Sequence, residues 1–366
     1  MSDYATNENT VTSVTPQSSS QTTTTDYYFY DRRYVSAIDY GFHNTGAICW
    51  WNSLLQTLIR LPALNLMILS MRDELYNKNR LARAYIDLLD IVDADGVDTP
   101  AQKNVAIAGA STHLLRAFAM EAQLQNKKVR LTGQESPLWG LGDFIELISD
   151  NIFRVFNNRY QVAVECIHCK HVTKAHDDKC THIDMYEMRN ATTKREFVRL
   201  ILEYESDLSD HTCERCKTQS KMILRGKTHK LLMLREIITL VYDADKTAPK
   251  WFPQTLEFLS TNDQMLRYEL VSIIEHSGSW NVNTGGSGHY YARIKCRNGR
   301  WYEFNDMCVT PSNSSPTSNS QILMYHLMEH SPLTDAERQS INAARAQLKS
   351  SGAQPTDTRS SDTNTQ

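Results

Sequence analysis

The chain has no excess of charge of either sign. Its 366 residues carry 39 Lys and Arg against 42 Asp and Glu, which gives a net charge of −3. Proteins that bind nucleic acids or anionic lipid surfaces present basic patches, and so we expect neither a nucleic acid nor a membrane as a partner. The sequence also lacks an apolar run near the roughly 20 residues that a membrane-spanning helix needs.

The two ends of the chain lack the residues that build a core. Residues 1–26 are rich in Ser, Thr, Asn and Gln and contain no Leu, Ile, Phe, Trp, Lys or Arg. Such a segment cannot bury enough apolar surface to fold, and it does not have the pattern of a secretory signal. We therefore expect disordered tails at 1–29 and 350–366, and a cytoplasmic or nuclear protein that is not secreted.

Four of the eight cysteines form two C-x-x-C pairs, Cys166-Ile-His-Cys169 and Cys213-Glu-Arg-Cys216. Four thiolates in this pattern can close a tetrahedral structural zinc site. A single pair could be redox-active, but two pairs in a chain without a secretion signal favour metal over disulfides. The same region also holds Cys180, His168, His171, His182 and His211, which are more typical of solvated loop residues than of ligands. We expect one structural zinc ion on the four paired cysteines.

Cys49 stands at the start of an apolar-periodic segment that predicts a helix. Gly46 allows a sharp bend before it. In the first turn, free N–H groups and the helix dipole favour an anion, which predicts a lowered thiol pKa. By itself the pattern is more typical of a small buried cysteine. Asn44 favours a nucleophile instead, because its carboxamide and the Cys49 N–H could form an oxyanion hole.

The candidate base and its orienting group lie near the other end of the chain. His289 begins a strand-like segment after a glycine-rich loop, whose Gly288 lets a backbone or substrate approach closely. The Asn298-Gly299 pair predicts a hairpin turn, which would bring Asn305 within reach of His289. A carboxamide can fix the imidazole tautomer without ionising, as in a Cys-His-Asn triad.

Asp306 is compatible with three roles. It could polarise His289, hold a water molecule near the oxyanion, or cap the following turn. We therefore assign Asn305 as the orienting group and Asp306 as a supporting one. The order Cys, His, Asn is that of papain-like proteases, but the 240 residues between Cys49 and His289 require an inserted subdomain.

The segments GFHNTGAICWWNSLLQTLIRL and GHYYARIKCRNGRWYEFND resemble the Cys box and the His box of the ubiquitin-specific protease family of deubiquitinases. The C-x-x-C pairs resemble that family's zinc-binding fingers. The resemblance implies an α+β, papain-like cysteine protease fold with a helical thumb, β-rich fingers and a β-rich palm. The expected ranges are 30–157 for the thumb, 158–228 for the fingers and 229–331 for the palm.

The resemblance also implies a function. It predicts a monomeric thiol isopeptidase that cleaves after the C-terminal Gly-Gly of ubiquitin through a thioester. The implied catalytic residues are Cys49, His289, Asn305, Asp306 and Asn44. Two alternatives stay open: a protease for another ubiquitin-like modifier, and a catalytically silent scaffold that binds ubiquitin.

The chain departs from the family pattern at two places near the site. Ala47-Ile48 stands where the family has Asn-Thr. The segment GQESPLWGLGDFIELI replaces the family motif whose carboxylates face an arginine of the substrate tail. We assign Glu135 and Asp143 to that role, although a surface acidic pair at a helix start fits equally well. Gly288 and Tyr290 are the other expected substrate contacts.

Hydrophobic periodicity predicts the remaining elements. We expect helices over 64–75, 80–92, 106–124 and 142–156, and strands over 230–242, 255–259, 268–276, 289–296, 300–304 and 321–327. Thr334 and Glu337 are spaced as a capping box, which predicts an accessory helix within 332–349.

Overall fold

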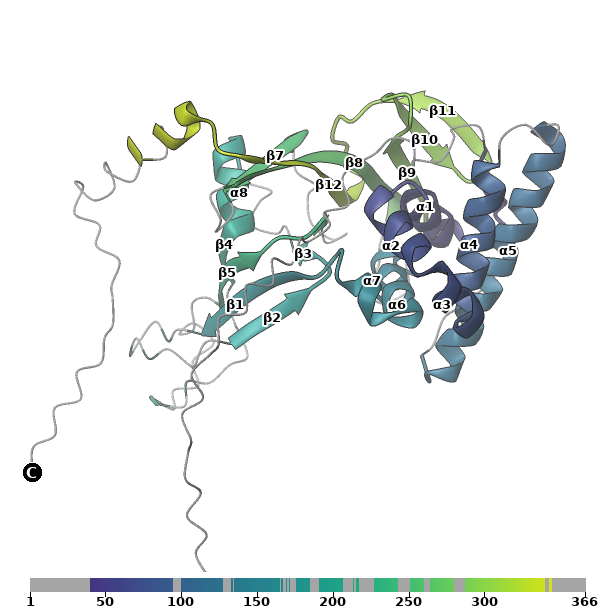
Figure 1. Cartoon of the computed structure of the whole chain (residues 1–366), viewed down its shortest axis with the longest axis horizontal. Coiled ribbons are helices and arrows are strands. Elements are labelled where there is room, and N and C mark those ends of the chain that lie inside the picture. The colour runs from purple at the N-terminus through teal and green to yellow at the C-terminus, as the bar shows by residue number, and fades with distance from the viewer. Residues whose placement is uncertain are drawn as a thin grey trace, which may run out of the picture.

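The chain forms a helical lobe and a β-rich lobe (Figure 1). This computed structural model describes residues 40–94, 100–127, 133, 135–164, 166, 169, 171, 176–184, 191–206, 213, 215, 216, 227–242, 251–259, 264–279, 287–339, 342 and 343. The tails expected at 1–29 and 350–366 lie outside the described residues.

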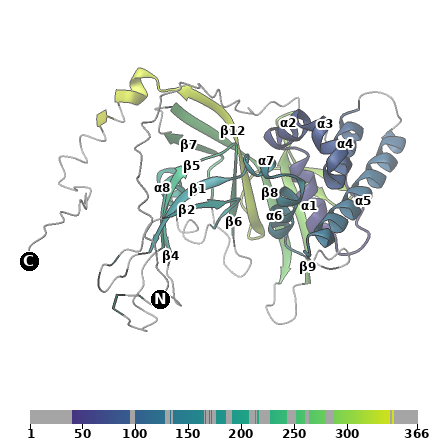
Figure 2. The ribbon, with the colours of Figure 1, turned by 60° about the horizontal axis from the view of Figure 1, so that its bottom comes forward.

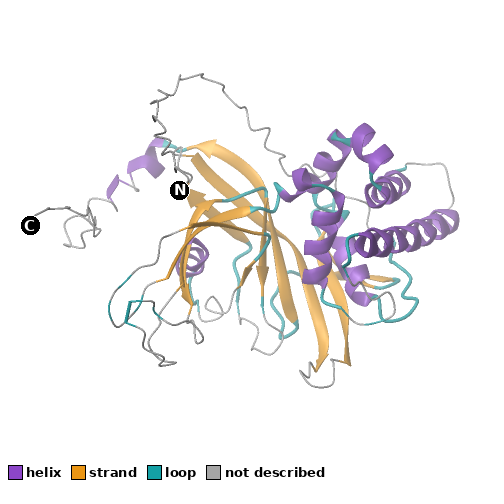
Figure 3. Cartoon of the chain, turned by 90° about the horizontal axis from the view of Figure 1, so that it is seen from below, coloured by secondary structure: helices purple, strands orange, loops and turns teal. Residues whose placement is uncertain are grey.

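The helices between residues 49 and 153 gather on one side of the molecule, apart from nearly all strands (Figure 3). Their bounds are α1 Cys49–Leu58, α2 Pro62–Ser70, α3 Arg72–Lys78, α4 Arg80–Asp93, α5 Pro100–Leu124, α6 Pro137–Ile148 and α7 Asp150–Phe153. Helix α1 lies between the other helices and the strands, and all ten of its residues are buried. The Trp51 ring stacks on Phe118 of α5 at 4.8 Å between centroids, which fixes α1 against its neighbours.

Two of the predicted helices are each broken in two. The segment 64–75 bends at Met71, between α2 and α3. The segment 142–156 breaks at Ser149, whose backbone is extended and whose hydroxyl accepts a hydrogen bond from the Asn151 N–H at 3.2 Å to cap α7. The prediction of single helices was wrong here because a bend at Met71 and the cap at Ser149 interrupt the apolar periodicity. No single described helix has the length and apolar composition to cross a membrane, and α1 with α2 reaches both only across a 76° bend.

A large antiparallel sheet forms the centre of the β-rich lobe. Its strands are β3 Ile183–Asp184, β6 Ile237–Val241, β7 Thr255–Leu259, β8 Gln264–Ser279, β9 Ser287–Lys295, β10 Trp301–Asn305, β11 Cys308–Ser312 and β12 Ser320–Pro332. The order is β11-β10-β9-β8-β12-β6-β3, with β7 paired to β8, and only the β3–β6 pair is parallel. Figure 2 shows the long strands β8 and β9 running beside α1.

A smaller sheet extends away from the helical lobe. Its order is β2-β1-β5-β4, with β1 Asn158–Val164, β2 His176–Cys180, β4 Glu203–Ser206 and β5 Lys227–Met233. Helix α8, Lys194–Leu202, was not predicted. The predicted strand 230–242 is in fact two strands, β5 and β6, which belong to different sheets. The chain therefore changes sheet between Met233 and Ile237.

Both faces of the large sheet are covered, and side chains on its central strands alternate between two cores. On β12, Ile322 and Met324 face the core shared with the helical lobe. Leu323, Tyr325 and Leu327 face the second core, which includes residues of α8. This period-two alternation follows from strand geometry and lets one strand support both layers.

His326 of β12 ties the two lobes together. Its Nε2 accepts a hydrogen bond from the Ala63 N–H at 3.1 Å, in the first turn of α2, where no side chain of the helix itself provides a cap. Its Nδ1 donates to the Leu327 carbonyl at 2.8 Å. Both bonds together require the neutral ring, and burial lowers the pKa of His326 to about 4.

We predict that protonation of His326 destabilises the fold in acid. The folded-state pKa of His326 lies below the ordinary value of 6.5. The stability that the neutral ring contributes is therefore complete above pH 6.5 and is lost as the pH falls towards 4. The loss amounts to about 3 kcal/mol. Urea unfolding between pH 4 and 7 will measure it. A His326→Gln variant retains a donor and an acceptor but does not titrate. Equal pH slopes for this variant and the wild type would contradict the assignment.

The accessory helix begins as its capping box predicts. The Glu337 carboxylate accepts a hydrogen bond from the Thr334 N–H at 2.8 Å, and the Glu337 N–H donates to the Thr334 hydroxyl at 3.3 Å. Residues 335–339 are helical. Glu337 also forms an ion pair with Arg267 of β8 at 2.9 Å, which holds the helix start against the large sheet.

Candidate active site

Cys49 is the first residue of α1, as the sequence predicts. The loop before it folds around the Asn44 side chain, whose Oδ1 accepts hydrogen bonds from the N–H groups of Gly46 at 3.1 Å and Ile48 at 3.3 Å. Gly46 has a φ of 133° and Ala47 a φ of 51°. This positive-φ pair turns the chain sharply, so that the helix starts at the thiol.

The expected lowering of the Cys49 pKa is not found in the resting site. The side chain is only 2% exposed. Burial raises the pKa of the Cys49 thiol, hydrogen bonds from the Tyr290, Trp50 and Cys49 backbone oppose it, and the Asp306 charge adds to the rise. The helix-start donors are therefore present, but desolvation outweighs them. A thiolate here needs an imidazolium to form with it.

His289 and Asn305 lie next to each other, as the hairpin turn predicts. Strands β9 and β10 pair in antiparallel register across the Asn298-Gly299 turn. His289 Nε2 lies 2.6 Å from Asn305 Oδ1. A carboxamide oxygen only accepts, so Nε2 carries the proton and Nδ1 keeps its lone pair. The pair thus selects the tautomer in which Nδ1 can act as a base.

Asp306 is held by two carboxamides from the helical lobe. Its Oδ2 accepts from Asn44 Nδ2 at 3.0 Å, and its Oδ1 accepts from Asn52 Nδ2 at 2.8 Å. Its backbone has a φ of 51°, and its carbonyl accepts from the Phe42 N–H at 2.9 Å. The Oδ2 lies 3.7 Å from His289 Nε2, close enough to stabilise an imidazolium. Asn52 of α1 is thereby joined to the same carboxylate as Asn44.

Gly288 and Tyr290, the expected substrate contacts, lie against a histidine that the sequence prediction did not include. His276 of β8 is 5% exposed and its ring lies 4.5 Å from the Tyr290 ring. A Cβ at Gly288 would meet His276 Nε2 at 2.1 Å, so only glycine fits there. Burial, and then the charge of His289, lower the pKa of His276. The sequence signal that could have identified His276 was its inward position in a strand with an alternating pattern.

Glu135 and Asp143, the two expected acidic contacts, lie in different surroundings. Glu135 directly precedes Ser136, the residue that caps α6. Asp143 lies within α6, and its carboxylate accepts a hydrogen bond from Lys127 Nζ at 2.6 Å. Lys127 also binds Glu146 at 2.7 Å. An internal cation therefore already faces the Asp143 carboxylate.

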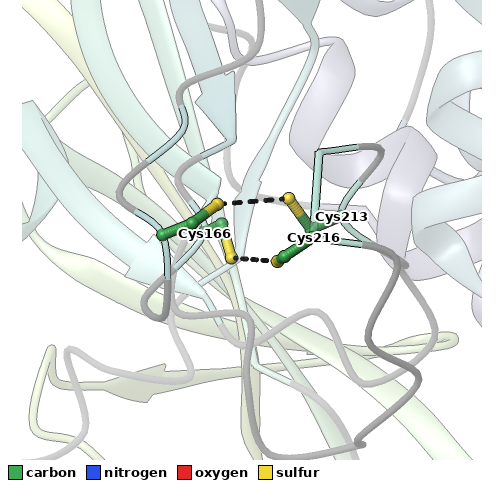
Figure 4. A group of neighbouring side chains, drawn as sticks. Cys166, Cys213 and Cys216 are labelled. Atoms are coloured by element: carbon green, nitrogen blue, oxygen red, sulfur yellow. Dashed lines mark hydrogen bonds between the residues drawn. The ribbon is translucent and has the colours of Figure 1, made fainter.

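The four paired cysteines converge in one cluster (Figure 4). Their sulfurs lie within 4.8 Å of one another, with 3.5 Å between Cys166 and Cys216 and 3.6 Å between Cys169 and Cys213. Tetrahedral ligands about 2.3 Å from a metal ion are separated by roughly 3.8 Å, whereas a disulfide requires about 2.05 Å. The cluster therefore fits one metal ion better than two disulfides.

The charge of the cluster also suits a cation. A hydrogen bond from the Cys216 backbone lowers the pKa of the Cys213 thiol to about 6. At Cys169 a hydrogen bond from the His171 backbone acts in the same direction, but burial and the other three sulfurs outweigh it and raise the pKa to about 12. The sulfurs thus compete for negative charge, and a bound divalent cation would relieve that competition.

Comparison with known proteins assigns the family. The model of the ubiquitin carboxyl-terminal hydrolase family matches residues 40–325, which include the Cys49 helix, the four-cysteine cluster and the His289–Asn305 hairpin. The chain belongs to this family, and the resemblance noted in its sequence is confirmed at that level.

Particular relatives are distant and longer. Ubiquitin carboxyl-terminal hydrolase 17-like protein 15 of Homo sapiens is 22% identical over 350 residues, and 17-like protein 11 of the same organism is 23% identical. Each match covers 89% of this chain but only 60% and 62% of those proteins. The chain thus spans about three fifths of the length of the curated relatives that it matches.

Solved structures show the same fold. The chain superposes with a TM-score of 0.58 and 18% identity on a SAGA DUB module of Ubp8, Sgf11, Sus1 and Sgf73 bound to monoubiquitin. A second structure of that module, bound to ubiquitin aldehyde, gives 0.57 and 18%. Each match covers 82% of this chain and 71% of the other. The expected α+β fold, with its helical, finger and β-rich parts, is confirmed.

We predict that the family's Asn would suit position 47 better than Ala does. Asn tolerates a positive φ more readily than Ala, so Ala47→Asn should raise the free energy of unfolding by about 0.5–1 kcal/mol. Ala47→Val should lower it by more than about 1 kcal/mol, because a β-branched side chain resists this conformation. Urea denaturation of the three proteins measures both changes. An equal stability of the Asn and Val variants would show that the loop does not hold this backbone in solution.

Proposed function

We propose that this chain is a thiol-dependent deubiquitinase that cleaves the isopeptide or peptide bond after the C-terminal Gly-Gly of ubiquitin. The observation that carries the proposal is the 2.6 Å contact between His289 Nε2 and Asn305 Oδ1. This contact leaves Nδ1 as a base, and the same strand supplies the Tyr290 backbone that bonds the Cys49 thiol. Family membership supports the substrate class.

The first half-reaction forms a thioester. His289 Nδ1 takes the thiol proton, and Cys49 Sγ attacks the carbonyl carbon of the terminal glycine. Asp306, 3.7 Å from Nε2, stabilises the imidazolium that results. The negative oxygen is stabilised by the Cys49 N–H and by Asn44, each donor contributing about 3–4 kcal/mol. The tetrahedral species then expels the lysine amine, which takes the proton from His289.

The Asn44 carboxamide has two N–H donors, one for Asp306 and one for the oxyanion. One Nδ2 hydrogen is used on Asp306 at 3.0 Å, and the second can point to the oxyanion.

In the second half-reaction, water gives a proton to His289 and attacks the thioester carbonyl. The Cys49 thiolate leaves and takes the proton from His289, and the carboxylic acid of ubiquitin is released and loses its proton to water.

We propose zinc as the ion of the four-cysteine cluster. Four thiolates in tetrahedral arrangement are typical of structural zinc sites, which have no open coordination position. Cys166 and Cys169 follow β1, and Cys213 and Cys216 lie between β4 and β5. A bound ion would join the two connections of the small sheet.

A protease for another ubiquitin-like modifier is the second candidate. The observation that favours it is the ion pair between Lys127 and Asp143. A carboxylate that already faces an internal cation attracts a substrate guanidinium less strongly than a free one. A modifier whose tail lacks arginine would lose less by this arrangement than ubiquitin does.

We predict that Cys49 forms a covalent adduct with ubiquitin bearing a C-terminal electrophile. Ubiquitin and several ubiquitin-like proteins with the same electrophile are compared by intact mass. Cys49→Ala should abolish the adduct and lower hydrolysis at least about a thousandfold, because the nucleophile is lost. Cys308→Ala, which removes an exposed thiol, should leave both unchanged. Labelling by another modifier alone would support the second candidate, and labelling by none would indicate a catalytically silent scaffold.

We predict one zinc ion per chain. Elemental analysis of the purified protein should give a zinc-to-protein ratio near one, and Cys213→Ser should lower it to near zero. Chelation should reduce the thermal stability of the wild type, since the ion joins two connections. Cys180→Ser, which changes a neighbouring thiol outside the cluster, should keep the ion. A metal-free wild type with unchanged stability after chelation would reject the proposal.

A further inference from the structure

Arg60 is a buried arginine just beyond the C-terminal end of α1, and it touches three segments that carry the site. Its side chain is only 1% exposed. Its Nη1 donates to the Gln56 carbonyl at 3.0 Å and also to the Gln56 carboxamide oxygen. Gln56 Nε2 in turn donates to the Tyr40 carbonyl at 3.3 Å. The guanidinium is therefore fixed from the α1 side.

The guanidinium lies against two buried aromatic rings. Its Cζ is 4.2 Å from the centroid of Phe304 and 5.2 Å from that of Tyr40. Phe304 directly precedes Asn305 on β10, and the Tyr40 segment leads through Phe42 and Asn44 to Asp306. A planar guanidinium can stack on a ring and hydrogen-bond in its own plane at once, whereas an ammonium or an apolar side chain cannot do both.

Arg60 places a charge in the protein interior at a desolvation cost, which its own contacts must offset. Arg60 contacts the Gln56 carbonyl and carboxamide, the Cys296 thiol and two aromatic rings, and these contacts fix the orientation of its guanidinium.

We propose that Arg60 is a positioning residue that sets Asn305 and Asp306 in register with the Cys49 helix. It stacks on Phe304 and is held by Gln56 of α1. Through these contacts, it fixes the end of β10 relative to α1, and thereby the Asn305 carboxamide that selects the His289 tautomer. This inference rests on the proposed function, because it concerns the base of that reaction. It adds a residue that touches neither the substrate nor the reacting atoms.

The test compares Arg60→Met with Arg60→Lys in the full chain. Arg60→Met should lower the Tm, because the Gln56 carbonyl and carboxamide oxygen lose their donor. Below that Tm, kcat on a fluorogenic ubiquitin substrate should fall by about tenfold to a hundredfold with little change in KM. Arg60→Lys keeps the charge without the planar stacking and should also lose kcat. Arg80→Met, which changes an exposed arginine at the start of α4, is the matched control and should behave as wild type. A wild-type kcat in Arg60→Met would overturn the proposal.

A readout without substrate separates this proposal from the proposed function. Nitrogen NMR of the histidine rings, with His289→Gln to assign the signal, should show a single Nε2–H tautomer in the wild type. Arg60→Met should show both tautomers, because Asn305 is no longer fixed. If ubiquitin is not a substrate, kcat is absent in every variant, but the tautomer comparison still decides. An unchanged tautomer in Arg60→Met would overturn the proposal.

Phe304→Leu gives a second route if Arg60→Met does not fold. This change removes the ring under the guanidinium and leaves Arg60 in place. We expect the same mixture of tautomers and a reduced kcat. Wild-type values for both would show that stacking on Phe304 does not position Asn305, and would reject the inference.

Discussion

The Asp306 carboxylate and the two carboxamides that bind it are the contact on which the site depends. Asn44 and Asn52 reach it from opposite sides of the nucleophile in the chain, at 3.0 and 2.8 Å, while Asp306 itself directly follows the β9–β10 hairpin. One carboxylate therefore joins the loop before Cys49, the helix after it and the turn beyond Asn305. Because two neutral donors satisfy it, its charge stays available to the His289 ring, whose Nε2 lies 3.7 Å away.

The Asp306 charge makes the Cys49 thiol harder to deprotonate. Burial and the Asp306 charge both raise the pKa of the Cys49 thiol, so the resting site favours a neutral thiol. In the proposed mechanism, proton transfer from Cys49 to His289 creates both charges together, and each then offsets the desolvation of the other. The helix start supplies donors to Cys49 Sγ from the Cys49 and Trp50 backbone, and the Tyr290 backbone adds another from β9. The surroundings of the Cys49 thiol are thus built from both lobes.

Several parts of the site were predictable because they depend on short-range patterns. The apolar period after Cys49 predicts a helix that starts at the thiol, and the Asn298-Gly299 turn predicts the hairpin that brings Asn305 to His289. The C-x-x-C pairs predict a cluster of four sulfurs. The single helices expected over 64–75 and 142–156 were wrong, since caps and bends at single residues interrupt the apolar period. The strand expected over 230–242 was wrong because its two halves join different sheets.

The sequence by itself determined which residues are the candidate nucleophile, base, orienting carboxamide and sulfur ligands, because each candidate follows from the start of one helix, one turn or one spacing. Only the tertiary structure decided the partners that cross between the elements. These include Asn52 on Asp306, His326 under α2, Lys127 on Asp143 and Arg60 on Phe304. The physical reason is that a side chain's partner in another element depends on how the two elements pack. Hydrophobic periodicity gives the buried face of each element but not the residue that meets it.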